Sequence, residues 1–301
     1  MDRVEKMSEQ TNTELSFHDK WSKNADCAFE QTITEGTDIF NWILTRNGFT
    51  SSAQLREYLS DKKGILDAGC GNGRVTALLR KHSDESKTEV VGIDLVAAEI
   101  ARANLKNAKN MRFESKDLMS DMQDLGKFDF IYCQEVLHHT HDPKHSFGNL
   151  VQLLEDDGEI AIYVYKQKAP IREFVDDYVR DRIGGLSYED AYKACEQITA
   201  LGKALADVKI KIEVPGVDLL EIKAGEYDLQ RFVYHFFMKC FWNDELSQND
   251  NVVINYDWYH PQLCSRHTIK EVRAWFEELG LIITQECVDF YGITVRGKRI
   301  V

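Results

Sequence analysis

The sequence predicts an α/β fold of the doubly wound class, in which a parallel sheet carries helices on both faces. Three observations predict it. Short apolar runs alternate with amphipathic helical patterns between residues 64 and 165. A glycine-rich turn follows the first of these runs. The chain has 301 residues, of which 43% are hydrophobic and four are proline, which suits one large globular domain or one domain carrying a sizeable insertion.

The first sixty residues are predicted to form a helical N-terminal cap, because large apolar side chains recur there at helical spacing. The anchors are Phe17, Trp21, Phe29, Ile39, Phe40, Trp42 and Ile43.

The core is predicted over residues 61–165 as five strands with helices between them. Strands are expected at 64–68, 89–95, 111–118, 128–133 and 159–165. Helices are expected at 74–81, 97–107 and 147–154, with a turn at Asp157-Gly158 before the fifth strand. Such alternation implies a parallel sheet whose ligand lies at the carboxyl ends of the strands.

After Tyr165 the alternation stops, and residues 166–262 are predicted to be a helical insertion rich in aromatic side chains. The last segment, 263–301, begins with a helix capped by Thr268, with Glu271 three residues on and Gly280 after its end. Strands over 281–288 and 290–296 then fit a hairpin that turns at Asp289.

The charge balance bears on the partners. Thirty-seven Lys and Arg against fifty Asp and Glu give a formal charge of −13, which disfavours nucleic acid and anionic lipid. No apolar run is long enough to span a membrane, and no signal peptide is recognisable. The seven scattered cysteines predict thiols rather than disulfides or a zinc site. We therefore expect a cytoplasmic protein that binds neither nucleic acid nor membranes, with a homodimer as an alternative assembly.

The turn after the first strand reads Asp67-Ala68-Gly69-Cys70-Gly71-Asn72-Gly73. Glycines at such a turn let the backbone approach a nucleotide-like ligand. A dinucleotide-binding turn usually lacks the acid, and Asp67 would repel a pyrophosphate but accept hydrogen bonds from an amino group. The pattern therefore favours a cationic amino-acid moiety over a diphosphate.

Two further acidic positions follow at strand ends. Asp94 ends the second strand, where a carboxylate can accept hydrogen bonds from both hydroxyls of a ribose. Asp117-Leu118 ends the third strand, where an adenine could be contacted; the plain alternative for Asp117 is a loop cap. Together with the glycine turn, these residues resemble the class I S-adenosylmethionine-dependent methyltransferases over residues 60–165 and 266–301.

The resemblance implies a Rossmann-like seven-stranded sheet with an antiparallel last strand. It also implies that the cofactor is S-adenosyl-L-methionine, with S-adenosyl-L-homocysteine as product. The cofactor positions it implies are Asp67, Ala68, Gly69, Gly71, Gly73, Asp94, Leu95, Asp117, Leu118 and Gln134. Val136-Leu137-His138-His139 is similar to a subgroup that methylates small molecules, including quinone precursors. Asp156-Asp157-Gly158 replaces the family's usual Pro-Gly-Gly, a departure confined to a turn.

The chemistry expected is in-line transfer of a methyl group, to which positioning can contribute several kcal/mol. A base is needed only where the nucleophile carries a proton, and His138 or His139 could accept it, with His138 slightly favoured. His141 and His145 extend the cluster, but adjacent histidines rarely bind one ion, so no metal is predicted.

Acceptor contacts are expected from the insertion, as a lid in which Tyr234, Trp258, Tyr259 and His260 line a pocket. The plain alternative is that these aromatic residues form core. Arg172, or Arg231 beside Tyr234, could pair with an acidic substrate group. The segment from Phe17 to Trp21 could fold over the cofactor.

The predicted function is methyl transfer to an oxygen, nitrogen or carbon of a small metabolite. The alternatives are a protein or RNA methyltransferase and a scaffold that binds S-adenosylmethionine without catalysis.

Overall fold

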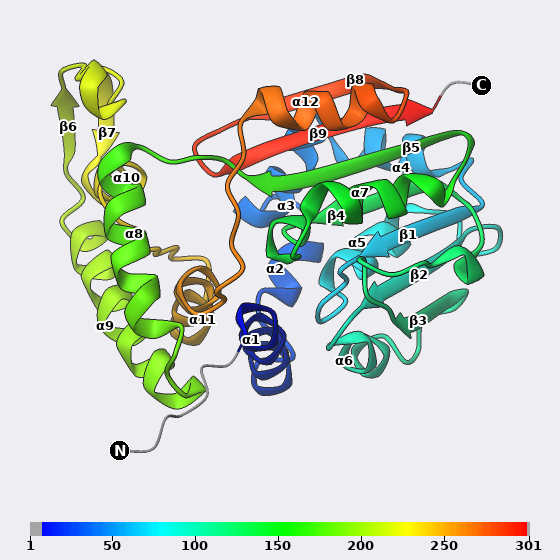
Figure 1. Cartoon of the computed structure of the whole chain (residues 1–301), viewed down its shortest axis with the longest axis horizontal. Coiled ribbons are helices and arrows are strands. Elements are labelled where there is room, and N and C mark those ends of the chain that lie inside the picture. Colours follow the sequence, from blue (N-terminus) through cyan, green and yellow to red (C-terminus); the bar gives the residue numbers. More distant parts are fainter. Residues whose placement is uncertain (1–7, 300–301) are drawn as a thin grey trace. The chain divides into compact units, whose positions relative to one another are not determined.

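The structure is a computed structural model that describes residues 8–299 (Figure 1). The chain divides into two units, each built from segments that are distant in sequence. The sheet unit contains residues 21–166 and the segment from 264 onward, and the helical unit contains the described residues up to 20 together with 167–263. Helix α1 (Glu9–Lys23) contributes residues to both units, because the division falls between Lys20 and Trp21.

The sheet unit is built on seven strands in the order β3-β2-β1-β4-β5-β9-β8. Neighbouring strands from β1 to β5 pair in parallel, whereas β9 pairs antiparallel with both β5 and β8. The strands are β1 (Gly64–Ala68), β2 (Glu89–Asp94), β3 (Met111–Ser115), β4 (Phe128–Gln134), β5 (Leu154–Tyr165), β8 (Leu281–Val288) and β9 (Gly292–Arg299). The predicted Rossmann-like sheet with an antiparallel last strand is confirmed.

Helices cover both faces of this sheet, as alternate side chains of β4 show. Ile131 and Cys133 belong to the main apolar core, to which helices α7 (Pro143–Gln152) and α12 (Ile269–Glu278) contribute. Phe130 and Tyr132 face α3 (Asp38–Arg46), α4 (Ser52–Leu59) and α5 (Arg74–His82). Helix α6 (Ala98–Asn104) packs on β2 and β3 through Ala101 and Phe113.

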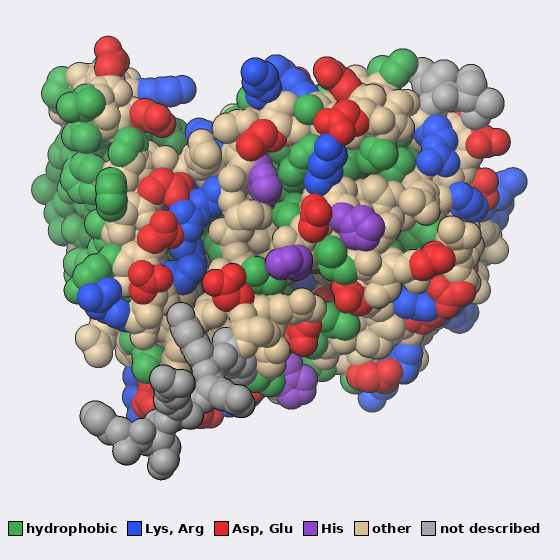
Figure 2. All heavy atoms as spheres, in the orientation of Figure 1, with side chains coloured by type: hydrophobic (Ala, Val, Ile, Leu, Met, Phe, Trp, Pro, Cys, Tyr) green, Lys and Arg blue, Asp and Glu red, His purple; other side chains and the backbone are tan. Residues whose placement is uncertain are grey.

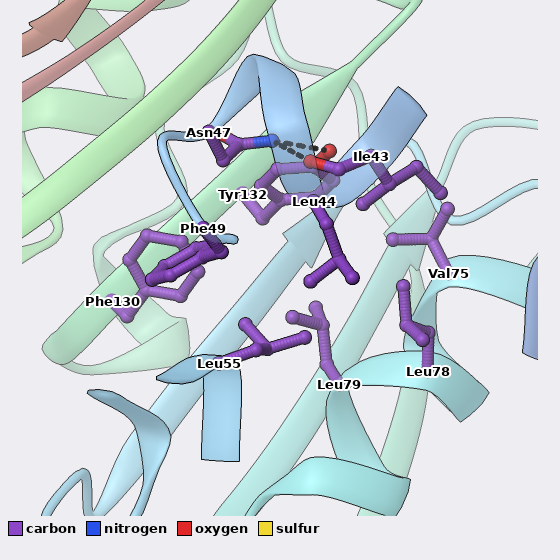
Figure 3. A pocket seen from close by; sticks show the side chains of 10 residues that line it. All are labelled: Ile43, Leu44, Asn47, Phe49, Leu55, Val75, Leu78, Leu79, Phe130 and Tyr132. Carbon is purple, nitrogen blue, oxygen red and sulfur yellow. Dashed lines mark hydrogen bonds between the residues drawn. The ribbon is translucent and has the colours of Figure 1, made fainter. Parts of the chain in front are cut away.

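A small apolar recess lies between α3, α4, α5 and β4 (Figure 3). It holds about 10 Å³, which is room for one water molecule at most. Asn47 Nδ2 donates to Ile43 O and to the Tyr132 hydroxyl at its upper rim. The recess is therefore part of the packed core and is no ligand site.

Several predicted boundaries in the sheet unit were wrong. Strand β5 begins at Leu154 rather than at 159, α6 ends at Asn104 rather than at 107, and β9 extends to Arg299 rather than to 296. Strand β3 ends at Ser115 rather than at 118, so Asp117 and Leu118 follow the strand. Helix α7 begins at Pro143 rather than at 147, because the Asp142 side chain accepts the His145 N–H as an N-cap. Strand β9 begins at Gly292 rather than at 290, since the Asp289 carboxylate accepts the N–H groups of Tyr291 and Gly292 in the turn.

The predicted capping box of Thr268 and Glu271 is present at the start of α12. The turn predicted at Asp157-Gly158 was wrong as a boundary, because these residues lie inside β5, at an irregularity with a positive φ of 63° at Asp157 and a register shift against β4. Short 3₁₀ turns occur at Gln123–Leu125 and Leu137–His139, and α2 (Phe29–Ile33) precedes α3.

The helical unit contains α8 (Pro170–Ile183), α9 (Tyr188–Asp207), α10 (Leu229–Phe236) and α11 (Gln248–Tyr259). The predicted helical insertion also contains a strand pair that the sequence did not indicate. Strands β6 (Lys211–Val214) and β7 (Gly225–Asp228) form an antiparallel pair, with a 3₁₀ turn at Asp218–Leu220 between them.

Large apolar side chains remain exposed on the helical unit, among them Phe174, Tyr178 and Leu219. Figure 2 shows hydrophobic side chains gathered over α9 and the β6–β7 hairpin. Within residues 8–299, no helix has both the length and the apolar character that crossing a membrane requires.

Candidate functional site

The glycine turn connects β1 to α5 at the carboxyl edge of the sheet, and its backbone is closely covered. Gly69 and Gly71 have positive φ values of 85° and 52°. A β-carbon on Gly69 would collide with the side chain of Val136, and one on Gly71 would lie 2.8 Å from the indole of Trp21. Gly73 precedes the first residue of α5. The glycines are therefore required by close approach as well as by conformation.

The N–H groups of this turn donate inside the protein. Those of Gly69 and Cys70 both donate to Ile93 O, at 2.7 and 2.8 Å, and that of Gly73 donates to Cys70 O at 2.8 Å. The Gly71 N–H donates to Asp94 Oδ2 at 3.0 Å. A phosphate-binding turn directs such groups at its ligand, so this turn is not built to hold a pyrophosphate.

Asp94, the last residue of β2, is held in place by three backbone donors. Its Oδ1 atom accepts the N–H groups of Val96 and Ala97 at 2.9 Å, and Oδ2 accepts that of Gly71. These bonds fix the carboxylate between the glycine turn and the start of α6, at the place where the sequence predicts a ribose. The neighbouring Leu95 is an exposed apolar side chain.

Asp67 is buried beneath the turn. Its Oδ2 atom accepts the Thr76 hydroxyl hydrogen bond at 2.5 Å. Burial raises the pKa of Asp67 to about 7, which the Thr76 hydrogen bond opposes and the nearby Asp94 charge reinforces. Ala68, the next residue, is also buried and faces the main core. The ionisation of Asp67 near neutral pH therefore depends on its burial, on the Thr76 hydrogen bond and on the charge of Asp94.

Asp117 and Leu118 lie in the turn after β3. The Asp117 carboxylate accepts the Met119 N–H at 2.9 Å, and Leu118 is buried in the main core. Asp117 therefore makes the cap hydrogen bond that was the plain alternative for it. This bond occupies only part of the acceptor capacity of a carboxylate.

Gln134 ends β4 and accepts a hydrogen bond from the Tyr132 hydroxyl. Glu135, which follows it, has a positive φ of 60°, an uncommon conformation for a residue other than glycine. Its carboxylate lies 3.6 Å from Arg74 at the start of α5. Neither Glu135 nor Arg74 was singled out from the sequence, because the pair joins segments sixty residues apart.

His138 is fully buried, at 0% exposure, and stacks on Tyr165 with ring centroids 3.6 Å apart. The backbone N–H of Tyr165 donates to His138 Nδ1 at 3.3 Å, so this network assigns the proton to Nε2. His139 retains 9% exposure and meets Tyr165 edge-on. The two histidines therefore differ in burial and in how their rings contact Tyr165.

Other parts of the turn's surroundings come from the N-terminal region. Trp21 covers Gly71, and Asn72 Nδ2 donates to the carbonyl groups of Ala25 and Cys27 at 3.1 and 3.0 Å. These contacts bring the segment after α1 to the glycine turn. The sequence suggested that the segment from Phe17 to Trp21 folds over the cofactor, but nothing in the sequence singled out Asn72.

The predicted acceptor residues all lie in the helical unit and are at most 5% exposed. Trp258 Nε1 and the Tyr259 hydroxyl both donate to the buried carboxylate of Asp176, at 2.9 and 2.8 Å. Tyr234 packs under the Arg172 guanidinium at 4.5 Å from the ring centroid. The structure thus brings three of the four predicted residues together around one ion pair, Arg172 and Asp176.

His260 belongs to a different network. Its Nε2 lies 3.1 Å from Leu186 O, and its Nδ1 lies 2.7 Å from Ser16 Oγ and 2.8 Å from the Tyr256 hydroxyl. A carbonyl only accepts, so the network assigns the proton to Nε2. Burial lowers the pKa of His260, which favours this neutral form.

Metal ligation finds no support in the arrangement of side chains. Among residues 8–299, no group of three or more His, Cys, Asp or Glu is placed to hold an ion. His145 is exposed on α7, with Nε2 3.3 Å from Met119 O. All seven cysteines fall within this range and are thiols.

Comparison with known proteins assigns the family. A profile described as a methyltransferase domain matches residues 49–286, so the chain belongs to this methyltransferase family. The ubiquinone biosynthesis O-methyltransferase of Coxiella burnetii is 29% identical over 101 residues, which are 33% of this chain and 42% of that protein. The trans-aconitate 2-methyltransferase of Deinococcus radiodurans is 33% identical over 101 residues, 33% of this chain and 37% of that protein.

The alignment thus spans less than half the length of these curated relatives. Among solved structures, the N-methyltransferase NodS from Bradyrhizobium japonicum, in complex with S-adenosyl-L-homocysteine, is 13% identical. The match covers 96% of this chain and 98% of that one, with a TM-score of 0.48.

Proposed function

We propose that this protein transfers a methyl group from S-adenosyl-L-methionine to an oxygen, nitrogen or carbon atom of a small organic molecule. The observation that carries the proposal is the inward hydrogen bonding of the glycine turn, with Asp67 beneath it and Asp94 bonded to it. Such a turn disfavours phosphates, and its two carboxyl groups suit amines and hydroxyls.

The donor and acceptor set fits this cofactor part by part. Asp94 would accept hydrogen bonds from ribose hydroxyls, and Asp117 from the adenine amino group. Leu95 and Leu118 would contact the purine. The backbone at Gln134 and at Gly69 would face the methionine part, near Asp67. When bound, the cofactor supplies a methyl group on a positively charged sulfur, which is already activated for attack.

The chain's own contribution is then mainly to position the acceptor. Alignment of nucleophile and methyl group can contribute several kcal/mol. We infer that His139 accepts a proton where the acceptor carries one, since His138 Nδ1 is already occupied by the Tyr165 N–H. We further propose that the helical unit selects the acceptor and that the protein is cytoplasmic, in keeping with its seven thiols.

Thermal unfolding with S-adenosyl-L-methionine and S-adenosyl-L-homocysteine tests the proposal. Either compound should raise the melting temperature of the wild type, because a ligand that binds only the folded state stabilises it. Asp94→Asn should weaken the affinity for S-adenosyl-L-homocysteine about tenfold or more, the usual effect of losing hydrogen bonds to a charged group.

Asp121→Asn is the matched control, because Asp121 also caps a turn of the sheet unit, through its bond to the Gln123 N–H, and is exposed. Its affinity should equal that of the wild type. If neither compound stabilises the wild type, the proposed function is wrong; if Asp94→Asn binds normally, the ribose assignment is wrong.

A further inference from the structure

The helical unit contains a buried guanidinium that pairs with one carboxylate and still has a buried nitrogen without an acceptor among the described residues. Arg172, on α8, is 1% exposed. Its one hydrogen bond to the described residues is from Nε to Asp176 Oδ2, at 3.0 Å, and its Nη1 atom is buried with no acceptor. A guanidinium carries five N–H donors, and leaving buried donors unsatisfied is costly.

Asp176 has no capacity left for the rest of this guanidinium. Besides Arg172 Nε, its Oδ2 accepts Trp258 Nε1, and its Oδ1 accepts the Tyr259 hydroxyl and the Lys239 N–H at 2.8 and 2.9 Å. Four donors fill the roughly four acceptor sites of a carboxylate. The acceptor for Arg172 Nη1 must therefore come from elsewhere.

A second arginine, Arg231, lies beside Tyr234 as Arg172 does, and it also has a buried nitrogen without an acceptor in the part of the chain that the structure describes. The guanidinium carbons of Arg172 and Arg231 lie 4.5 and 5.6 Å from the ring centroid of Tyr234. Arg231 Nη2 donates to Trp242 O at 3.2 Å, whereas its Nη1 is buried without an acceptor in the described structure. Two guanidinium groups with unfilled donors thus lie near one aromatic ring.

Further cations lie around the same aromatic residues. Trp258 has four cations within 6 Å of its ring, namely Lys168, Arg172, Arg180 and Lys239. Asp176 pairs with Arg172, and Asp177 pairs with Arg180. Nearby positive charge favours an anionic ligand over a neutral one for the unfilled donors of Arg172 and Arg231.

We propose that Arg172 and Arg231 bind an oxyanion, a carboxylate or phosphate group, on the acceptor molecule. Guanidinium donors form a planar fork that matches either group. Packing against Tyr234 and Trp258 holds the Arg172 fork in one orientation, which lowers the entropy cost of binding. The assignment of the anion to the acceptor rests on the proposed function, whereas the anion site itself does not.

Calorimetric titration and thermal unfolding with two probes, inorganic phosphate and malonate, test the site. Sodium chloride at the same ionic strength is the reference. One or both probes should bind the wild type and raise its melting temperature above that in chloride, and the stronger probe identifies the group. Arg172→Gln should bind that probe at least about tenfold more weakly.

Arg182→Gln is the matched control, because Arg182 lies on the same helix and is exposed over Tyr178, so it removes an equal charge away from the site. It should bind the probe as the wild type does. Arg231→Gln, at a half-buried position, provides a second test should Arg172→Gln not fold, and about tenfold weaker binding is again expected.

Two results would overturn the site: no effect of either probe beyond chloride, or equal binding by Arg182→Gln and the folded site variant. S-adenosyl-L-homocysteine, titrated in parallel, separates the two proposals. Binding of that compound without the anions refutes the oxyanion site alone, and binding of the anions without that compound refutes the proposed function alone.

Discussion

Asp67 illustrates how one residue of the site depends on its surroundings. Its carboxyl group is buried, hydrogen-bonded to Thr76 and close to the charge of Asp94. Burial raises its pKa from 3.8 to about 7, so near neutral pH the group is balanced between its two forms. A cationic group arriving nearby would favour the ionised form.

This shift predicts a pH dependence of stability. Below about pH 4 the proton is bound in both the folded and the unfolded state. Between pH 4 and 7 only the folded state keeps it, so rising pH removes stability, by about 1.4 kcal/mol per pH unit. Above pH 7 both states are ionised and the loss stops. Relative to Asp67→Asn, the wild type should therefore lose free energy of unfolding from pH 5 to 7 and level off toward pH 8 in urea titrations.

Thr76→Val provides a second test of the raised pKa of Asp67. The Thr76 hydrogen bond lowers the pKa of Asp67, so removing it should extend the loss of stability to higher pH. A wild-type advantage that stays constant or grows between pH 5 and 7 would show that Asp67 does not hold its proton in the folded state.

At this scale, sequence spacing was enough to place Asp67, Asp94 and the glycines, because their positions follow from a strand and the turn after it. It could not find the pair of Arg74 and Glu135, which forms only when β4 lies beside β1. The buried state of His138 is equally a product of β5, whose Tyr165 provides both the stacked ring and the N–H donor.

At the scale of elements, Trp21 of α1 lies in close contact with the glycine turn. The indole of Trp21 lies where a β-carbon on Gly71 would be, and the φ of 52° adds its own strain for any other residue. Helix α1 thus limits the shape of a turn fifty residues away, and a side chain on Gly71 would disturb both.

Gly71→Ala should therefore destabilise the protein by more than backbone strain alone. Gly280→Ala is the control, because Gly280 has a φ of 69° and open space around its α-carbon. We expect a loss of about 1–2 kcal/mol for Gly280→Ala and a further 1–3 kcal/mol from overpacking for Gly71→Ala, measured by urea unfolding.

A double-mutant cycle separates these two effects. In a Trp21→Leu background the extra cost of Gly71→Ala should shrink toward that of Gly280→Ala, because the colliding indole atoms are gone. An extra cost that is the same in both backgrounds would mean that Trp21 is not what excludes a side chain at Gly71.

Which elements were predictable depended on the strength of their local patterns. Most of the parallel strands are buried apolar runs, and the α12 cap is a complete local motif, so these elements were recognised. Strands β6 and β7 are four residues each and contain no fully buried residue, and periodicity gives no signal for their pairing. The early start of α7 was readable in principle, since Asp142-Pro143 is a typical N-cap and first-turn pair.

At the scale of the whole molecule, the chain crosses between its two units three times. The sheet unit is interrupted by residues 167–263, and the described residues before 21 group with that insertion. The proposed cofactor contacts all belong to the sheet unit, whereas the proposed oxyanion contacts all belong to the helical unit. The two ligands should therefore protect different parts of the backbone.

Hydrogen exchange with S-adenosyl-L-homocysteine tests the assignment of the cofactor contacts to the sheet unit. A ligand slows exchange where it stabilises the structure against local opening, so protection should rise over residues 67–73, 94–97 and 115–119. Helix α9, which contributes no proposed cofactor contact, should exchange as it does in the free protein. The same titration with Asp94→Asn should lose most of the protection at equal ligand concentration. Protection that is as strong over α9 as over the glycine turn would contradict the assignment of cofactor binding to the sheet unit.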